Sequence, residues 1–281
     1  MFKGLYTVTS GMLAQQRRTE ILTNNMANAN TPGYKADMST VRSFPDMLMS
    51  AVKSNGIPTE KGLNLLQSQQ VGALNTGVYL QETLANYAQG SLTQTDLATD
   101  VALVDGTMPV DAASGNQGAV FYRLRAEDGN EAYTRNGSFT LDGQGNLVTG
   151  MGLLVLDDQG QPIQLQNDKF TVTPDGQILD ENNQQVARLG VSFAANTDVL
   201  MKQENGLYRM LDGEALPSAY GIDGVTFGMQ QGYLEASNVD ASRAMTDLLT
   251  AYRAFEANQK VLQAYDKSMD KAVNELGRVN G

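Results

Sequence analysis

Apolar residues recur at every seventh position near the end of the chain, over residues 237–276. The recurring residues are Leu248, Phe255, Leu262, Met269 and Leu276, and a second row of heptad positions holds Ala244, Ala251, Asn258, Tyr265 and Ala272. This a/d pattern is typical of a coiled-coil helix. Ser237 and Asp240 have the spacing of a capping box at its start, and no Pro or Gly follows until Gly277. We therefore predict one long helix over residues 237–276.

The first stretch of the chain, residues 5–29, has a row of mostly apolar residues spaced alternately by three and four. They are Leu5, Val8, Met12, Gln15, Thr19, Leu22, Met26 and Ala29. This spacing predicts a second coiled-coil helix, which ends at Thr31-Pro32-Gly33 because proline lacks a donor and disfavours helix in the preceding residue. A helix with one narrow apolar seam must bury that seam against other helices, so we expect the two terminal helices to pack together. The pattern leaves open whether they form a hairpin within one chain or join copies of it.

The middle of the chain changes character twice. Residues 34–77 have weak periodicity, which predicts a short helix around Phe44 to Val52 and then a linker or extended arm. Residues 78–235 contain short β-prone runs, namely 101–104, 120–124, 153–156, 170–173, 186–193, 207–211 and 225–229. Turn dipeptides such as Asp128-Gly129 and Asp175-Gly176 separate them, as in an antiparallel sandwich or open barrel. The predicted fold is thus α+β, with N- and C-terminal coiled-coil helices packed together and an inserted antiparallel β domain.

Composition excludes several classes of function. The net charge of −11 argues against nucleic acid or an anionic membrane as a partner. The chain has no Cys and no His, so it lacks thiolate chemistry, the commonest general base and the commonest metal ligand. No apolar run approaches the ~20 residues of a membrane helix, and the start of the chain lacks the apolar core of a signal peptide. We expect no catalytic, cofactor or metal site, no membrane insertion and no cleaved signal peptide.

Acidic clusters offer the only candidate chemistry. Asp142 to Asn146 supplies oxygens on a tight turn, but it lacks the acidic spacing of a calcium loop, so a hairpin turn is the better interpretation. Asp157-Asp158 and Asp180-Glu181 could be carboxylate pairs that cleave glycans, yet each lies in a predicted turn. A cell-surface glycan-binding or glycan-cleaving β domain is therefore the competing class of function. It predicts a pocket with converging carboxylates and aromatic side chains.

Asparagines crowd the end of the first predicted helix, at Asn24, Asn25, Asn28 and Asn30. Asparagine has poor helix propensity, and its amide could cap carbonyls or bond a neighbouring helix. A frayed helix end is the alternative interpretation.

Several motifs resemble those of bacterial flagellar rod and hook proteins. Near the N-terminus they are Val8 to Met12, Asn24 to Asn28 and Asn30 to Lys35; in the middle, Gly90 to Thr95, Asp100 to Ala102, Ala132 to Phe139 and Gly145 to Thr149; near the C-terminus, Gly232 to Val239 and Arg253 to Glu256. The resemblance thus covers nearly the whole chain. One departure lies at Val104 to Pro109, where the family usually has a Gly-x-Gly turn followed by two aromatic residues.

The resemblance implies an axial subunit, not an enzyme, that is exported through the flagellar type III apparatus and lies outside the cytoplasmic membrane. Its terminal helices, residues 1–33 and 236–281, would form an inner tube with copies of itself and other rod and hook proteins. Residues 78–235 would lie outside, and residues 34–77 resemble the arm of the distal rod protein. A proximal rod or rod–hook junction component is the alternative. The expected assembly residues are Leu5, Val8, Met12, Leu22, Asn24, Asn25, Met26, Asn28, Leu248, Phe255, Leu262, Met269 and Leu276.

Overall fold

The computed structural model describes residues 2–57, 63–112, 115–203 and 205–274. It divides into two compact units. The helix–arm unit comprises residues 1–24, 37–84 and 242–281, and the β unit comprises residues 25–36 and 85–241. Two helices and many antiparallel strands confirm the predicted α+β class. Leu276, the last residue of the predicted seam, lies outside the described residues.

Two long helices lie near the ends of the chain, as the heptads predicted. Helix α1 spans Phe2–Ala27 and helix α2 spans Ala241–Asn274. The start predicted at Ser237 is wrong by four residues, because the Ser237 hydroxyl accepts a hydrogen bond from the Val239 amide at 3.3 Å in a turn before the helix. Neither helix combines the length and hydropathy needed to cross a membrane, as far as the described residues show.

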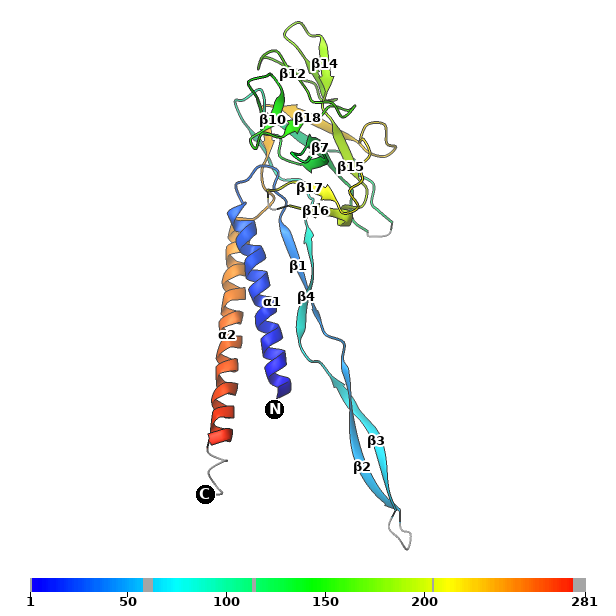
Figure 1. The fold of residues 1–281 in the computed structure, drawn as a ribbon, viewed down its shortest axis with the longest axis vertical. Helices are drawn as coiled ribbons and strands as arrows, with labels where there is room; N and C mark the ends of the chain where they lie inside the picture. Colours follow the sequence, from blue (N-terminus) through cyan, green and yellow to red (C-terminus); the bar gives the residue numbers. More distant parts are fainter. Residues whose placement is uncertain (1, 58–62, 113–114, 204, 275–281) are drawn as a thin grey trace. The chain divides into compact units, whose positions relative to one another are not determined.

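Helices α1 and α2 are antiparallel neighbours within the helix–arm unit (Figure 1). A Cβ atom on Gly4 would overlap Tyr265, and one on Gly11 would lie 3.2 Å from the amide nitrogen of Asn258. The contact with residue 265 precedes the contact with residue 258 along α1, so the two helices run in opposite directions. The two glycines leave room for these larger side chains of α2 to approach the α1 backbone.

Residues 37–57 and 63–85 form two successive strand pairs, which we call the arm. Strand β1 (Asp37–Ser43) pairs with β4 (Val78–Ala85), and β2 (Met47–Ile57) pairs with β3 (Leu63–Leu74) in a long antiparallel ribbon (Figure 1). The short helix predicted around Phe44 to Val52 is wrong. A helix of two turns is marginal by itself, whereas β2 is paired with β3 along its whole length.

The β unit is built around an eight-stranded sheet. Its order is β16-β17-β8-β7-β11-β10-β9, and β15 also pairs with β7. These strands are β7 (Ala119–Arg125), β8 (Glu131–Thr134), β9 (Phe139–Leu141), β10 (Leu147–Thr149), β11 (Leu154–Val155), β15 (Val191–Ala194), β16 (Leu200–Lys202) and β17 (Tyr208–Met210). A 3₁₀ turn, Thr197–Val199, leads into β16.

Three smaller sheets complete the β unit. One contains β12 (Thr171–Val172), β13 (Gln177–Leu179) and β14 (Gln185–Arg188). The others pair β6 (Val101–Asp105) with β18 (Phe227–Gln231), and β5 (Leu92–Gln94) with β19 (Tyr233–Glu235). The single strand predicted over residues 186–193 is divided into β14 and β15. The division falls at Gly190, where a Cβ atom would lie 2.6 Å from the Leu156 carbonyl oxygen.

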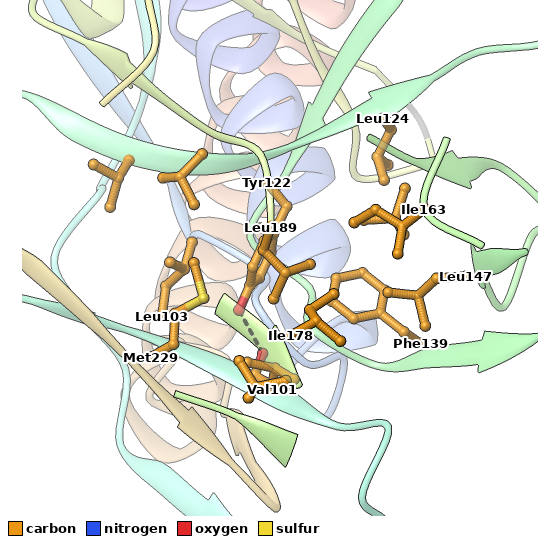
Figure 2. Close-up of a cluster of buried hydrophobic side chains, with 14 of the residues drawn as sticks. Val101, Leu103, Tyr122, Leu124, Phe139, Leu147, Ile163, Ile178, Leu189 and Met229 are labelled. Carbon is orange, nitrogen blue, oxygen red and sulfur yellow. Dashed lines mark hydrogen bonds between the residues drawn. The ribbon is translucent and has the colours of Figure 1, made fainter. Parts of the chain in front are cut away.

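Both faces of the central strand β7 are buried. Val120, Tyr122 and Leu124 point into the main hydrophobic cluster, which Figure 2 shows, and Phe121 packs in a second cluster with Tyr208. The Tyr122 hydroxyl donates a hydrogen bond of 2.7 Å to the Val101 carbonyl, and burial raises the pKa of this phenol well above its usual value. The core of the β unit therefore spans more than one sheet and fixes the positions of the loops that leave β6 and β8.

Candidate functional site

The predicted helix seams are partly or fully buried. Ala244 and Ala251 on α2 are buried, and Ala14 on α1, which lies outside the predicted seam, is buried as well. The larger predicted residues are all partly buried, namely Leu5, Val8, Met12, Leu22 and Met26 on α1 and Leu248, Phe255, Leu262 and Met269 on α2. Their role in joining subunits stays a prediction.

Large apolar side chains also lie outside these seams. Tyr6 and Leu13 on α1 are 69% and 51% exposed, and Tyr252 on α2 is 52% exposed. Met245 and Leu249 on α2 are exposed beside Tyr252, while Val261 and Val273 are exposed in other directions around the helix. The heptad search missed this second surface. Its signal was the spacing of Met245, Leu249 and Tyr252 by four and then three residues, beside the first row.

The asparagine cluster at the end of α1 divides into two pairs. Asn25 is buried and accepts a hydrogen bond of 3.2 Å from the Tyr34 hydroxyl, while Asn28 accepts one of 3.1 Å from Thr31. Asn24 and Asn30 are exposed. Asn25 and Asn28 therefore stabilise the turns that follow the helix, which is a more ordered arrangement than a frayed end.

A network of four charged side chains lies inside the β unit. The Glu235 carboxylate accepts a hydrogen bond of 2.7 Å from the Lys35 ammonium and one of 2.6 Å from Arg135. Arg135 also donates to Asp105 at 2.7 Å and to the Val120 carbonyl at 2.8 Å. The side chains of Lys35, Arg135 and Glu235 are at most 2% exposed. Two cations thus face two carboxylates, and we call this set the charge network.

Burial opposes the charged forms of Lys35, Arg135 and Glu235, and the neighbouring charges either oppose or reinforce that effect. The pKa of Glu235 is raised by burial, but Arg135 and Lys35 outweigh this and hold it below its usual value. Burial and the Arg135 charge lower the pKa of Lys35 despite its pairing with Glu235. Burial also lowers the pKa of Arg135, yet Glu235 and Asp105 raise it more. The charges therefore stabilise one another, and each would be costly to bury alone.

Three segments that are distant in sequence meet at the charge network. The Asn238 side chain accepts a bond of 2.7 Å from the Ala36 amide and donates one of 2.7 Å to the Asn86 carbonyl. The Gly33 amide donates to the Glu235 carbonyl at 2.8 Å. Lys202 donates to the Lys35 carbonyl at 2.7 Å and lies 3.7 Å from the centroid of the Tyr34 ring. We call residues 33–36, 86–91 and 232–238 together the junction.

Sequence reasoning missed the charge network. A signal was present, because Lys35, Arg135 and Glu235 each lie within a motif that carried the family resemblance. Asp105 lies in the segment that departs from the family pattern, at the end of β6. The sequence alone does not show that these four side chains converge, since they belong to strands and loops separated by up to 200 residues.

The network predicts a specific dependence on pH. Because the pKa of Glu235 is lowered in the folded state, its stabilising contribution is fully present above its unfolded pKa of about 4.3 and is lost as pH falls through the lower folded value. Glu235→Gln cannot titrate there. The difference in free energy of unfolding between the two proteins should therefore be constant from pH 7 to about pH 5 and shrink below about pH 4. Urea unfolding at several pH values would measure it, and a difference that grows in acid would contradict the assignment.

In the part of the chain that the structure describes, the carboxylates of Asp142, Asp157 and Asp180 accept hydrogen bonds from the backbone of their own turns. Asp142 accepts bonds of 2.8 Å from the backbone of Gln144 and Asn146 in the hairpin turn between β9 and β10. Asp180 lines a shallow polar hollow with Phe170, but its carboxylate accepts two backbone bonds, and the Phe170 side chain is buried. This geometry favours turns over sugar binding.

Comparison with known proteins gives matches along most of the chain. Three family descriptions match: Flagella basal body rod protein over residues 5–35, Flagellar hook protein FlgE/F/G D1 domain over residues 117–180, and Flagellar basal body rod FlgEFG protein C-terminal over residues 230–275. Lys35, Arg135 and Glu235 fall one in each matched region. The charge network therefore joins all three.

Individual relatives match over nearly their full length. The flagellar hook-basal body complex protein FlhO of Bacillus subtilis (strain 168) is 44% identical, over 99% of this chain and 100% of the relative. The flagellar basal-body rod protein FlgG of the same strain is 31% identical, over 98% and 99%. FlgG of Caulobacter vibrioides is 32% identical, over 98% and 99%.

Proposed function

Because this chain belongs to the family of structural flagellar basal-body rod proteins, we propose that it is a subunit of the distal rod, which assembles with copies of itself into a helical tube and transmits torque to the hook. No catalytic step belongs to this function. Its partners are other rod and hook proteins and the type III export apparatus, which carries the chain across the cytoplasmic membrane without a cleaved signal peptide.

The single observation that carries self-assembly is the second apolar surface of the helix pair. Helices α1 and α2 approach each other at Gly4 with Tyr265 and at Gly11 with Asn258, yet Tyr6, Leu13 and Tyr252 remain more than half exposed. Apolar surfaces of this kind on a soluble chain mark sites of association. In the proposed tube, α1 and α2 pack as coiled coils with those of neighbouring copies, and these exposed side chains become buried.

The proposal assigns a role to each part of the chain. Residues 1–33 and 236–281 form the inner tube, residues 34–77 form an arm, and residues 78–235 form an outer domain. The predicted seam residues join helices, and Asn24, with its exposed side chain, bonds a neighbouring subunit. Asn25 and Asn28 support that contact by ordering the end of α1.

One observation favours a second candidate position. Within one strain of Bacillus subtilis, the chain shares 44% identity with the hook-basal body complex protein FlhO and 31% with the rod protein FlgG. A cell makes its proximal rod, distal rod and rod–hook junction from different axial proteins. The higher identity with FlhO than with the rod protein FlgG of the same strain supports the proximal rod or the junction, whereas the long arm supports the distal rod.

A tagged copy of the chain would test both positions. The turn between β10 and β11 offers an insertion point between Gly150 and Met151, which are both exposed. We expect electron microscopy of purified hook–basal bodies to show a label along the distal part of the rod. A label confined to the proximal rod or the hook boundary would support the second candidate. If the motile cell incorporates no label while the tagged chain is made and folded, the rod proposal is wrong.

A further inference from the structure

The arm is interrupted at one level in both of its strands. Strand β1 ends at Ser43 and β2 begins at Met47, while β3 ends at Leu74 and β4 begins at Val78. Across this break, the Phe44 amide donates a hydrogen bond of 2.9 Å to the Gly77 carbonyl. The Phe44 ring packs against the Tyr79 ring with 5.1 Å between centroids. The break is therefore an ordered joint between two strand pairs.

Helix α1 binds this joint through two hydroxyl side chains. Thr7 donates a hydrogen bond of 3.3 Å to the Thr76 carbonyl. Ser10 accepts one of 3.2 Å from the Val78 amide and donates one of 2.9 Å to the Thr7 carbonyl of its own helix. These residues all belong to the helix–arm unit. Side chains one helical turn apart on α1 thus satisfy two backbone groups that the strands leave unpaired.

Gly77 is the residue that permits this approach. Its φ of +143° is rarely adopted by residues with a side chain, and a Cβ atom there would lie 3.1 Å from the Ser10 Cβ and would overlap its hydroxyl. The Gly77 amide donates a hydrogen bond of 2.9 Å to the Asn75 side chain, and the Gly77 carbonyl accepts one from the Phe44 amide. The Thr76 carbonyl, both backbone groups of Gly77 and the Val78 amide therefore all have hydrogen-bond partners.

We propose that Thr7 and Ser10 of α1, with the Thr76–Gly77–Val78 link, form an anchor that fixes the arm to the helix at its break. The direction of the β2–β3 ribbon is then set by α1. The role of the anchor in assembly rests on the proposed rod function: each arm would take a position fixed by the tube-forming helices. Thr7 and Ser10 are positioning residues in this scheme.

The absence of cysteine from the chain makes disulfide trapping a direct test. In Ser10→Cys with Gly77→Cys the two Cβ atoms would start 3.1 Å apart, so a shift of a few tenths of an ångström in the link brings them to the 3.5–4.5 Å that is typical of a disulfide. Ser10→Cys with Gly72→Cys is the matched control, since a Cβ atom on Gly72 meets nothing within 4 Å. After mild oxidation of the purified full chain, we expect an intrachain bridge in the first pair, seen as a mobility shift without dimer, and at least tenfold less in the control. Equal bridging of both pairs, or dimers alone, would overturn the anchor.

Hydrogen exchange tests the same anchor without the strain of a substituted Gly77. Thr7→Ala with Ser10→Ala removes both contacts with the link, and we expect the Val78 amide to exchange about tenfold faster. Thr23→Ala with Ser268→Ala is the control, because these hydroxyls bond only carbonyls of their own helices in the described contacts. Unchanged exchange at Val78 in the first double variant would overturn the proposal. Both measurements use the isolated chain, so failure of the rod function leaves their outcome unaffected.

Discussion

Glu235→Gln is expected to lower the free energy of unfolding of the β unit by about 3–5 kcal/mol, because it leaves Lys35 and Arg135 buried without their shared carboxylate. The amide retains the size of the side chain, so the loss reports charge and not packing. Chemical unfolding followed by the fluorescence of the tyrosines, which are mostly in the β unit, would measure the change.

Glu181→Gln is the matched control for this substitution. Glu181 pairs with Lys169 at 3.9 Å, and both side chains are at least half exposed. An exposed pair of this kind contributes about 0–1 kcal/mol, so the control should unfold almost as the parent protein does. If both variants lose the same small amount of stability, the charge network does not hold the β unit together.

Leu262→Asp is expected to abolish incorporation of the chain into a rod. Leu262 lies in the α2 seam and is partly buried, so a carboxylate there would face the apolar surface of α1. Burial of an unpaired charge costs several kcal/mol, so the substituted helix should no longer pack against its partner helices. Purified hook–basal bodies from cells that make the variant should contain none of it, while the β unit keeps the stability of the parent protein.

Two exposed residues of α2 supply controls. Gln263 is exposed, so Gln263→Asp should incorporate normally. Leu249 is 44% exposed and lies on the second apolar surface with Met245 and Tyr252, so Leu249→Asp separates the two apolar surfaces. If Leu249→Asp leaves the isolated helix pair intact and still blocks incorporation, the second apolar surface joins the subunits. Normal rods from Leu262→Asp would remove the seam from assembly.

Patterns with a short period were predictable from the sequence. Leu248, Phe255 and Leu262 repeat at seven residues, so the helix and its inward face followed from local order alone. Strand β7 was predicted from its run of apolar residues. Both of its faces are buried, so its sequence lacks the alternation of apolar and polar residues that identifies a half-exposed strand. The end of a helix is less certain, as the start at Ala241 instead of Ser237 shows.

Features that depend on distant pairing were not predictable. The segment from Met47 to Val52 is part of strand β2 because residues 63–74 lie beside it, and no local signal records that partner. The charge network likewise depends on Lys35 and Glu235 meeting across 200 residues. A charged residue in a motif is usually solvated, so its burial could be inferred only once the fold had placed an opposite charge against it.

The junction also determines how the protein bears mechanical load. The first and last segments of the β unit are bonded directly to each other, through Gly33 with Glu235 and Ala36 with Asn238, although the second pair lies 202 residues apart in sequence. A pull that separates the two ends of the chain would stretch these bonds first and bypass the strands folded between them. Force could thus pass from one terminal segment to the other without straining the hydrophobic core.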